Sequence, residues 1–320
     1  MPSGGSRLVS AGQPLPPLVA LVGPTGVGKS AAAVELAEWV GAEIISADSR
    51  LLYRGMDVGT AKPGPDLRRR VPHHLIDVAN PEQPWSLAVY CQAALEAIEG
   101  VHARGRLPLL AGGTGQYITA ILEGWKPPPG AADPSLRQEL QAYAAEHGAE
   151  GLHRRLQEVD PERAAALDPR NVRRVVRALE VYQLSGRPAS ELQSSEAPPF
   201  RTLRLGLSLP RPELYRRIDD RIRRMLRGGL VEEVRALLDR GITLEHPVMS
   251  AIGYRQVAEH LQGKKSLAQA EAEMRRLTRQ FVRRQANWFK AEDPRLHWFV
   301  ADDQVVQRMA AAIMSWLGGG

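Results

Sequence analysis

Apolar runs and amphipathic segments alternate along the first third of the chain. Short apolar runs predict strands at 18–22, 43–47 and 107–111. The spacing of apolar residues predicts helices at 29–40, 86–104 and 115–123. Strands that alternate with helices are typical of a parallel sheet wrapped by helices. The pattern therefore predicts an α/β fold.

This alternation breaks at residues 125–130, where three prolines and a glycine predict a domain boundary. Beyond the break, helices are predicted at 134–147, 149–158, 160–167 and 171–185, followed by a polar loop at 186–199. The run 201–209 predicts a strand that returns to the sheet. Further helices are predicted at 211–227, 230–240, 250–261 and 266–291.

The composition is typical of a soluble protein in a reducing compartment. The chain has 320 residues and no apolar run near the roughly 20 residues that cross a bilayer. Its single cysteine, Cys91, excludes an internal disulfide and favours a cytoplasmic location. The first 17 residues lack the apolar segment of a signal peptide and predict a flexible tail.

Positive charge is concentrated in one part of the chain. The net charge is +6, yet residues 201–290 alone hold 20 basic and 10 acidic side chains, a surplus of 10. This surplus favours a polyanionic partner, with nucleic acid as the leading candidate. A basic surface that only faces solvent is the alternative.

A phosphate-binding loop follows the first predicted strand. Its sequence matches the pattern G-x-x-x-x-G-K-[ST] and comprises Gly23, Pro24, Thr25, Gly26, Val27, Gly28, Lys29 and Ser30. In such a P-loop, main-chain N–H groups and the lysine bind a di- or triphosphate, and the serine hydroxyl can bind Mg²⁺. The loop therefore predicts a phosphate site with Mg²⁺ at Ser30.

The motif and the predicted elements together give a domain plan. We expect a P-loop NTPase-like parallel sheet flanked by helices at 18–125 and 199–310, with 1–17 as a tail. The segment 126–198 is expected to form an all-helical insertion domain.

The strand at 43–47 is followed directly by an acidic residue, Asp48. The strand at 107–111 is followed by a glycine turn that contains no acidic residue. Ligands of open α/β sheets bind at the carboxyl ends of the strands, so Asp48 is expected beside the P-loop. There it would act as a base or bind metal-associated water. A role as a turn or helix cap with Ser49 is the alternative.

A set of longer motifs makes the chain resemble the tRNA dimethylallyltransferases. Beyond the P-loop, the motifs are residues 45–63, 72–77, 112–117, 174–182 and 252–255, and a C-terminal segment built on Thr278-Arg279-Gln280 and residues 283–289. They occur in the family's order and span residues 18 to 290.

This resemblance implies transfer of a dimethylallyl group from dimethylallyl diphosphate to N6 of adenosine 37, beside the anticodon of tRNA. Diphosphate is released, and Mg²⁺ is required. Asp48 corresponds to the family's general base and Arg221 to a residue that reaches the diphosphate, with Thr25 as a further catalytic residue. The expected partners are the tRNA anticodon stem-loop and dimethylallyl diphosphate, without a membrane, for a protein that is a monomer.

Contacts to tRNA are expected from several parts of the chain, including the insertion. The candidates are Asp48, Ser49, Arg50, Leu51, Thr114, Arg173, Arg174, Arg177, Arg255, Arg279, Arg283, Gln285 and Trp288. Burial of Trp288 and Phe289 in the core is an equal alternative to stacking on an unstacked base.

Two other functions share parts of these signals. A small-molecule or nucleoside kinase would use the P-loop for ATP, but it would need an acid after the strand at 107–111. A non-catalytic RNA-binding ATPase would share the basic half, but it gives Asp48 no role.

Overall fold

The computed structural model describes residues 15–83, 85–127, 133–192 and 194–319. It divides the chain into two compact units, Met1–Leu122 with Pro198–Gly320, and Glu123–Ala197. Most of the predicted tail lies outside the described residues. The first strand already begins at Pro17, which pairs with Arg201.

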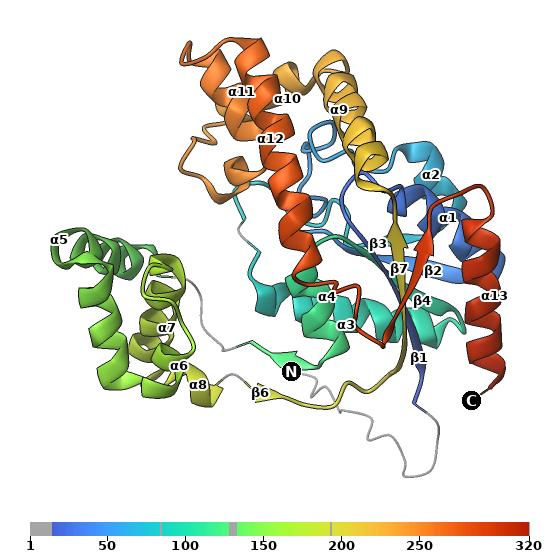
Figure 1. The fold of residues 1–320 in the computed structure, drawn as a ribbon, viewed down its shortest axis with the longest axis horizontal. Coiled ribbons are helices and arrows are strands. Elements are labelled where there is room, and N and C mark those ends of the chain that lie inside the picture. Colours follow the sequence, from blue (N-terminus) through green and yellow to red (C-terminus); the bar gives the residue numbers. More distant parts are fainter. Residues whose placement is uncertain (1–14, 84, 128–132, 193, 320) are drawn as a thin grey trace, which may run out of the picture. The chain divides into compact units, whose positions relative to one another are not determined.

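The larger unit is built on a six-stranded parallel sheet with the strand order β3-β2-β4-β1-β7-β8 (Figure 1). The strands are β1 (Pro17–Val22), β2 (Ala42–Ala47), β3 (His73–His74), β4 (Leu107–Gly112), β7 (Arg201–Ser208) and β8 (Leu296–Val300). The predicted α/β fold and its four strands are confirmed. Two strands of the sheet were not predicted: β3, which has two residues, and β8, an edge strand in which only Leu296 is buried.

Helices cover both faces of the sheet. On one side lie α1 (Lys29–Val40) and α13 (Val305–Gly318), and on the other α3 (Leu87–Ala103) and α4 (Gly115–Leu122) (Figure 1). The rings of Tyr90 on α3 and Tyr117 on α4 stack 3.7 Å apart. The Tyr90 hydroxyl donates to the Ser46 carbonyl of β2 over 3.2 Å, which joins these helices to the sheet.

Most of the remaining helices of this unit follow β7 in the sequence. They are α9 (Arg211–Arg227), α10 (Leu230–Asp239), the 3-10 turn η1 (Pro247–Ser250), α11 (Tyr254–Leu261) and α12 (Leu267–Ala286), while α2 (Pro65–Arg70) lies between β2 and β3. One face of α9 is apolar and buried, and it consists of Leu214, Ile218, Ile222 and Met225. The prediction of one helix over 250–261 was wrong, because Gly253 adopts a φ of 104° and α11 starts only after it.

The smaller unit contains α5 (Pro134–Val159), α6 (Pro161–Ala165), α7 (Val172–Ser185) and α8 (Ala189–Leu192). Gly148 interrupts α5 with a φ of 75°, which confirms the predicted pair of helices. The expectation of an all-helical insertion needs correction. Where the chain enters and leaves this unit, β5 (Trp125–Lys126) and β6 (Ser194–Ser195) form an antiparallel pair.

A separate hydrophobic core stabilises the smaller unit. Its members come from α5, α6, α7 and α8 and include Leu140, Leu152, Leu156, Ala164, Val175, Val176 and Leu179. Each fully buried aliphatic side chain of this size stabilises the fold by about 1.5–3 kcal/mol relative to exposure. The unit therefore has a basis for folding as a compact body.

Candidate functional site

The P-loop connects β1 to α1 through glycines that no other residue could replace without strain. Gly23, Gly26 and Gly28 have φ values of 146°, 84° and 108°. A Cβ on Gly23 would lie 2.4 Å from the Leu207 carbonyl oxygen. All three positions therefore favour glycine for the backbone conformation, and Gly23 and Gly26 also lack space for a Cβ.

Lys29 is held inside this loop. Its Nζ donates to the Gly23 carbonyl over 2.9 Å and to the Pro24 carbonyl over 2.8 Å. Burial lowers the pKa of Lys29 to about 8, with Arg221 adding to the shift and Asp48 opposing it. An anion that enters the site would therefore stabilise the charged form of Lys29.

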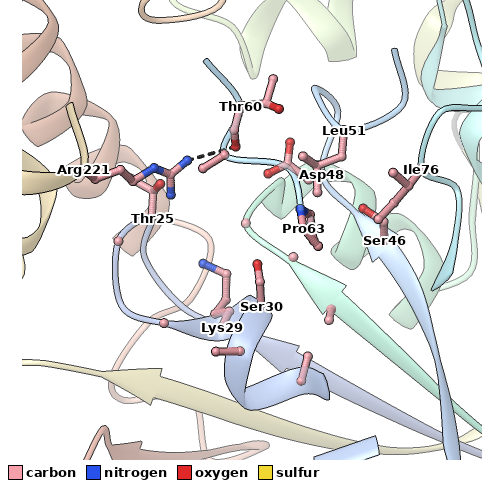
Figure 2. A pocket seen from close by; sticks show the side chains of 18 of the residues that line it. Thr25, Lys29, Ser30, Ser46, Asp48, Leu51, Thr60, Pro63, Ile76 and Arg221 are labelled. Atoms are coloured by element: carbon pink, nitrogen blue, oxygen red, sulfur yellow. Dashed lines mark hydrogen bonds between the residues drawn. The ribbon is translucent and has the colours of Figure 1, made fainter. Parts of the chain in front are cut away.

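Asp48 follows the last residue of β2, as predicted. Since Ala47 of β2 pairs with Gly112 of β4, Asp48 lies near the turn after β4. Its Oδ1 accepts the Arg50 main-chain N–H over 2.9 Å. Figure 2 shows the carboxylate facing the same space as Arg221, Lys29 and Ser30.

Arg221 reaches this space from α9. Its Nη2 donates to the Thr60 carbonyl over 3.0 Å, a bond drawn in Figure 2. Burial lowers the pKa of the Arg221 guanidinium, while the Asp48 carboxylate raises it. An arginine stays protonated even so, because its ordinary pKa is above 12.

These groups line a cavity of about 470 Å³. One side is cationic and rich in N–H groups, with Lys29, Arg221 and the P-loop. On the other side of Asp48 the lining is mostly apolar, with Leu51 and Ile76 labelled in Figure 2 and the Ser46 hydroxyl beside Ile76. The cavity is suited to a molecule with an anionic head and a short apolar tail.

Three of the predicted tRNA contacts, Ser49, Arg50 and Leu51, directly follow Asp48 in the sequence. The Ser49 N–H donates to Thr114 Oγ1 over 3.0 Å, which joins the ends of β2 and β4. Arg50 Nη2 donates to Ser250 Oγ over 3.0 Å. Leu51 is buried and lines the cavity. In α11, Arg255 Nη2 donates to the Leu244 carbonyl over 2.9 Å.

Gln285, near the end of α12, braces the P-loop. Its Oε1 accepts the Thr25 N–H over 2.9 Å, and its Nε2 donates to the Gly113 carbonyl over 2.8 Å. The residue is 3% exposed. No local sequence pattern predicts this bond, because Gln285 and Thr25 are 260 positions apart.

The other candidates on and after α12 differ in exposure. Arg279 forms an ion pair of 2.7 Å with Asp219 of α9 and lies over the Tyr215 ring. Arg283 is exposed. Trp288 is 40% exposed, and a Cβ on Gly115 would meet its ring.

In the smaller unit, the three predicted contact residues belong to α7. Arg173 and Arg174 are exposed. Arg177 pairs with the buried Glu180 over 2.7 Å, so part of its charge is already neutralised within this unit.

The described residues contain no group of three or more His, Cys, Asp or Glu side chains that could hold a metal. The adjacent His73 and His74 contact the Val71 carbonyl and the Glu43 carboxylate. No helix within the described part of the chain is long and apolar enough to cross a membrane.

Two family models match the chain, IPP transferase over residues 51–292 and isopentenyl transferase over residues 16–70. A tRNA dimethylallyltransferase of Thermomicrobium roseum is 53% identical over 274 residues, which cover 86% of this chain and 83% of the relative. One of Roseiflexus sp. is 48% identical over 302 residues, 94% of this chain and 99% of the relative.

Solved structures show the same relationship. The tRNA isopentenylpyrophosphate transferase of Bacillus halodurans has a TM-score of 0.70 and 38% identity, covering 94% of this chain and 97% of its own. A eukaryotic dimethylallyltransferase acting on tRNA has a TM-score of 0.81 and 26% identity, covering 95% of this chain and 80% of its own.

Proposed function

The chain belongs to the IPP transferase family, and we propose that it uses this cavity to move a dimethylallyl group from dimethylallyl diphosphate to N6 of adenosine 37 in tRNA. It is a transferase that modifies tRNA, as its relatives' names state. The observation that carries the proposed chemistry is the placement of Asp48 between a cationic and an apolar side of one cavity.

The cationic side is suited to a leaving diphosphate. The allylic C–O bond breaks as negative charge grows on the diphosphate, and fixed N–H groups and cations stabilise that charge. Lys29, Arg221 and the P-loop N–H groups would supply this field, except the Thr25 N–H, which Gln285 holds; Thr25 lines the cavity beside them. The diphosphate would compete with the Gly23 and Pro24 carbonyls for the Lys29 ammonium.

The acceptor is the exocyclic N6 of adenine, a weak nucleophile. In this proposal the Asp48 carboxylate accepts a hydrogen bond from N6 and takes its proton as the C–N bond forms. The main-chain bond from Arg50 to Oδ1 fixes the orientation of this carboxylate. The apolar side chains beyond it would surround the five-carbon group and exclude water.

A divalent metal suits this donor set, with Mg²⁺ as our specific proposal. Mg²⁺ keeps several waters and binds proteins through one or two oxygen ligands together with substrate phosphates. The Ser30 hydroxyl and, through water, the Asp48 carboxylate could hold it with diphosphate oxygens. When bound, the metal would neutralise charge on the leaving diphosphate.

The tRNA contacts remain proposals. The exposed Arg173, Arg174 and Arg283 and the half-exposed Trp288 offer charges and a ring for phosphates and an unstacked base. N6 is accessible to a cavity only if the target base leaves its stack. A cytoplasmic monomer also stays a prediction, and light scattering would measure the oligomeric state.

One assay separates this function from its rivals. The protein is mixed with Mg²⁺, dimethylallyl diphosphate labelled in the allyl group, and unmodified tRNA. We expect label on the RNA without ATP. A requirement for ATP with loss of its γ-phosphate would indicate a kinase, and tRNA binding without label transfer would indicate a non-catalytic RNA-binding protein.

A further inference from the structure

The Glu233 carboxylate of α10 binds three consecutive main-chain N–H groups of the loop that follows β2. Its Oε2 accepts from Asp57 over 2.7 Å and from Val58 over 2.8 Å, and its Oε1 accepts from Gly59 over 3.0 Å. Hydrogen bonds to an ionised group are among the strong ones in proteins. One side chain therefore fixes the path of this loop, although it is not among the residues that line the cavity.

A fourth donor holds the carboxylate itself. The hydroxyl of Tyr254, the first residue of α11, donates to Glu233 Oε1 over 2.6 Å. Burial raises the pKa of Tyr254, so the phenol keeps the proton for this bond. The ring lies so close to Gly59 that a Cβ there would be 2.5 Å from a ring carbon. Gly59 and Tyr254 belong to two separate sequence motifs, 45–63 and 252–255, and the proposed chemistry gives neither of these two residues a role.

The loop held in this way ends at the cavity. The next residue, Thr60, lines the cavity, and its carbonyl accepts the bond of 3.0 Å from Arg221 (Figure 2). The Thr60 hydroxyl donates back to the Met56 carbonyl over 2.7 Å, and Lys62 Nζ donates to the Tyr53 carbonyl over 2.8 Å. Hydrogen bonds within the loop thus stabilise its conformation, and its Thr60 carbonyl binds the Arg221 guanidinium from one side.

We propose that Glu233, held by Tyr254, is a positioning residue for the diphosphate site and acts through the Thr60 carbonyl on Arg221. The carboxylate sets the loop, the loop sets the carbonyl, and the carbonyl holds the guanidinium in the direction of the anion. Arginine has several rotatable bonds, so such a fixed acceptor removes conformations that could not bind diphosphate. This inference rests on the proposed function of the cavity.

The test measures binding of inorganic diphosphate with Mg²⁺ to the full chain. Glu233→Gln puts an amide NH₂ among the N–H donors, and we expect it to weaken diphosphate binding about ten-fold while tRNA affinity changes less than about two-fold. Tyr254→Phe keeps the ring against Gly59 and should weaken binding by about two- to five-fold. Glu232→Gln is the matched control, since it makes the same change on the exposed neighbour, and it should bind as the unaltered protein does.

A double-mutant cycle shows whether the effect passes through Arg221. In an Arg221→Ala background, Glu233→Gln should weaken diphosphate binding less than about two-fold, because the two residues act in series. An equal loss in both backgrounds, or unchanged binding by Glu233→Gln alone, would overturn the proposal. If Glu233→Gln does not fold, Tyr254→Phe decides by the same criteria, and wild-type affinity overturns the proposal. Failure of the unaltered protein to bind diphosphate would contradict the proposed function itself.

Discussion

At the scale of single residues, the position of Asp48 suits both roles that the sequence left as alternatives, a turn cap and a base. Its Oδ1 accepts the Arg50 N–H over 2.9 Å, as a turn cap does, while the carboxylate faces the cavity (Figure 2). A cap could be asparagine as well as aspartate, because both side chains accept main-chain hydrogen bonds. Only the charged carboxylate can also take a proton at neutral pH.

Asp48→Asn therefore separates chemistry from structure. We expect the single-turnover rate of transfer to fall about 10²- to 10⁴-fold, the usual contribution of a general base, while tRNA affinity and unfolding temperature stay close to those of the unaltered protein. Rapid-quench measurement of labelled tRNA gives the rate. Full activity in the variant would leave Asp48 with the cap role alone, and rescue by higher Mg²⁺ would favour a metal-binding role.

Lys29 gives the site a dependence on pH. Its pKa of about 8 lies below the ordinary 10.5, so the ammonium begins to lose its proton just above neutrality. An anion binds the protonated form better, hence diphosphate affinity should fall as the pH rises through 8, by at most about ten-fold per pH unit. Titration calorimetry from pH 6.5 to 9.5 measures this slope. Lys29→Ala should bind more weakly and lose the slope, whereas a slope that persists would implicate another group.

The same shift has the opposite effect on stability. Between about pH 8 and 10.5 the unfolded chain binds the Lys29 proton and the folded chain does not. Stability rises with pH wherever the unfolded state holds more protons, so this contribution is complete above 10.5 and is lost as the pH falls through 8. Binding and stability therefore change in opposite directions across this range.

At the scale of elements, α12 ties distant parts of the site together. Gln285 binds both the P-loop and the turn after β4, and Arg279 pairs with Asp219 on α9. The helix thus supports the cationic side of the cavity, which Gln285 also lines. Substitutions of Gln285 and Arg283 are expected to have different effects, because Gln285 is buried and Arg283 is exposed.

Gln285→Ala would leave the Thr25 N–H and the Gly113 carbonyl without this partner. An unsatisfied buried polar group costs about 1–3 kcal/mol, so we expect the free energy of unfolding to drop by about that amount. Diphosphate binding should weaken too, since Thr25 belongs to the P-loop. Urea denaturation measures the first effect. A variant of unchanged stability but reduced tRNA affinity would instead support the contact to tRNA predicted from sequence.

Arg283→Glu tests the basic face of the same helix. Arg283 is exposed, so charge reversal should leave the fold and diphosphate affinity unchanged while tRNA binding weakens and depends less steeply on salt. Arg279→Glu offers a comparison, because it also breaks the pair with Asp219 and should lower the unfolding temperature. Filter binding across a salt series provides the slopes. If the salt dependence of tRNA affinity were the same for Arg283→Glu and the unaltered chain, this face would not contact tRNA.

At the scale of the whole molecule, the insertion is a separate body with its own core. Its two ends lie side by side, since Trp125 pairs with Ser195 and the Glu196 N–H donates to the Gly124 carbonyl over 3.0 Å. A short linker can therefore join the ends of the larger unit without strain on its sheet.

Replacement of residues 123–197 by a short Gly-Ser linker should thus leave the larger unit folded. We expect diphosphate affinity to persist, because the residues that line the cavity all belong to the larger unit. Affinity for tRNA should fall, since Arg173 and Arg174 are removed with the insertion. Circular dichroism and binding assays measure these effects. Undiminished tRNA affinity would exclude the insertion as a contact region.

The sequence by itself determined the order of the longer elements up to α12, the P-loop and the position of Asp48 at a strand end, but not β3, β8, α2 or α13. These features depend on local chemistry. Apolar runs set the strands, glycines permit the φ values of the loop, and Gly148 divides α5 where the pattern predicted two helices. The family motifs indicated the reaction. They could be identified from the sequence because each is a short contiguous stretch. Boundaries were less accurate at Gly253, whose positive φ delays a helix.

Only the tertiary structure decided what supports these residues. Glu233 and the N–H groups it binds are about 175 positions apart, and Gln285 and Thr25 are 260 apart. No local pattern records such pairs, because each partner alone resembles an ordinary polar residue on a helix or in a loop. The antiparallel pair of β5 and β6 arises in the same way, since two-residue strands form only when the ends of the insertion meet. Local sequence sets the groups that do the chemistry, and long-range packing sets their orientation.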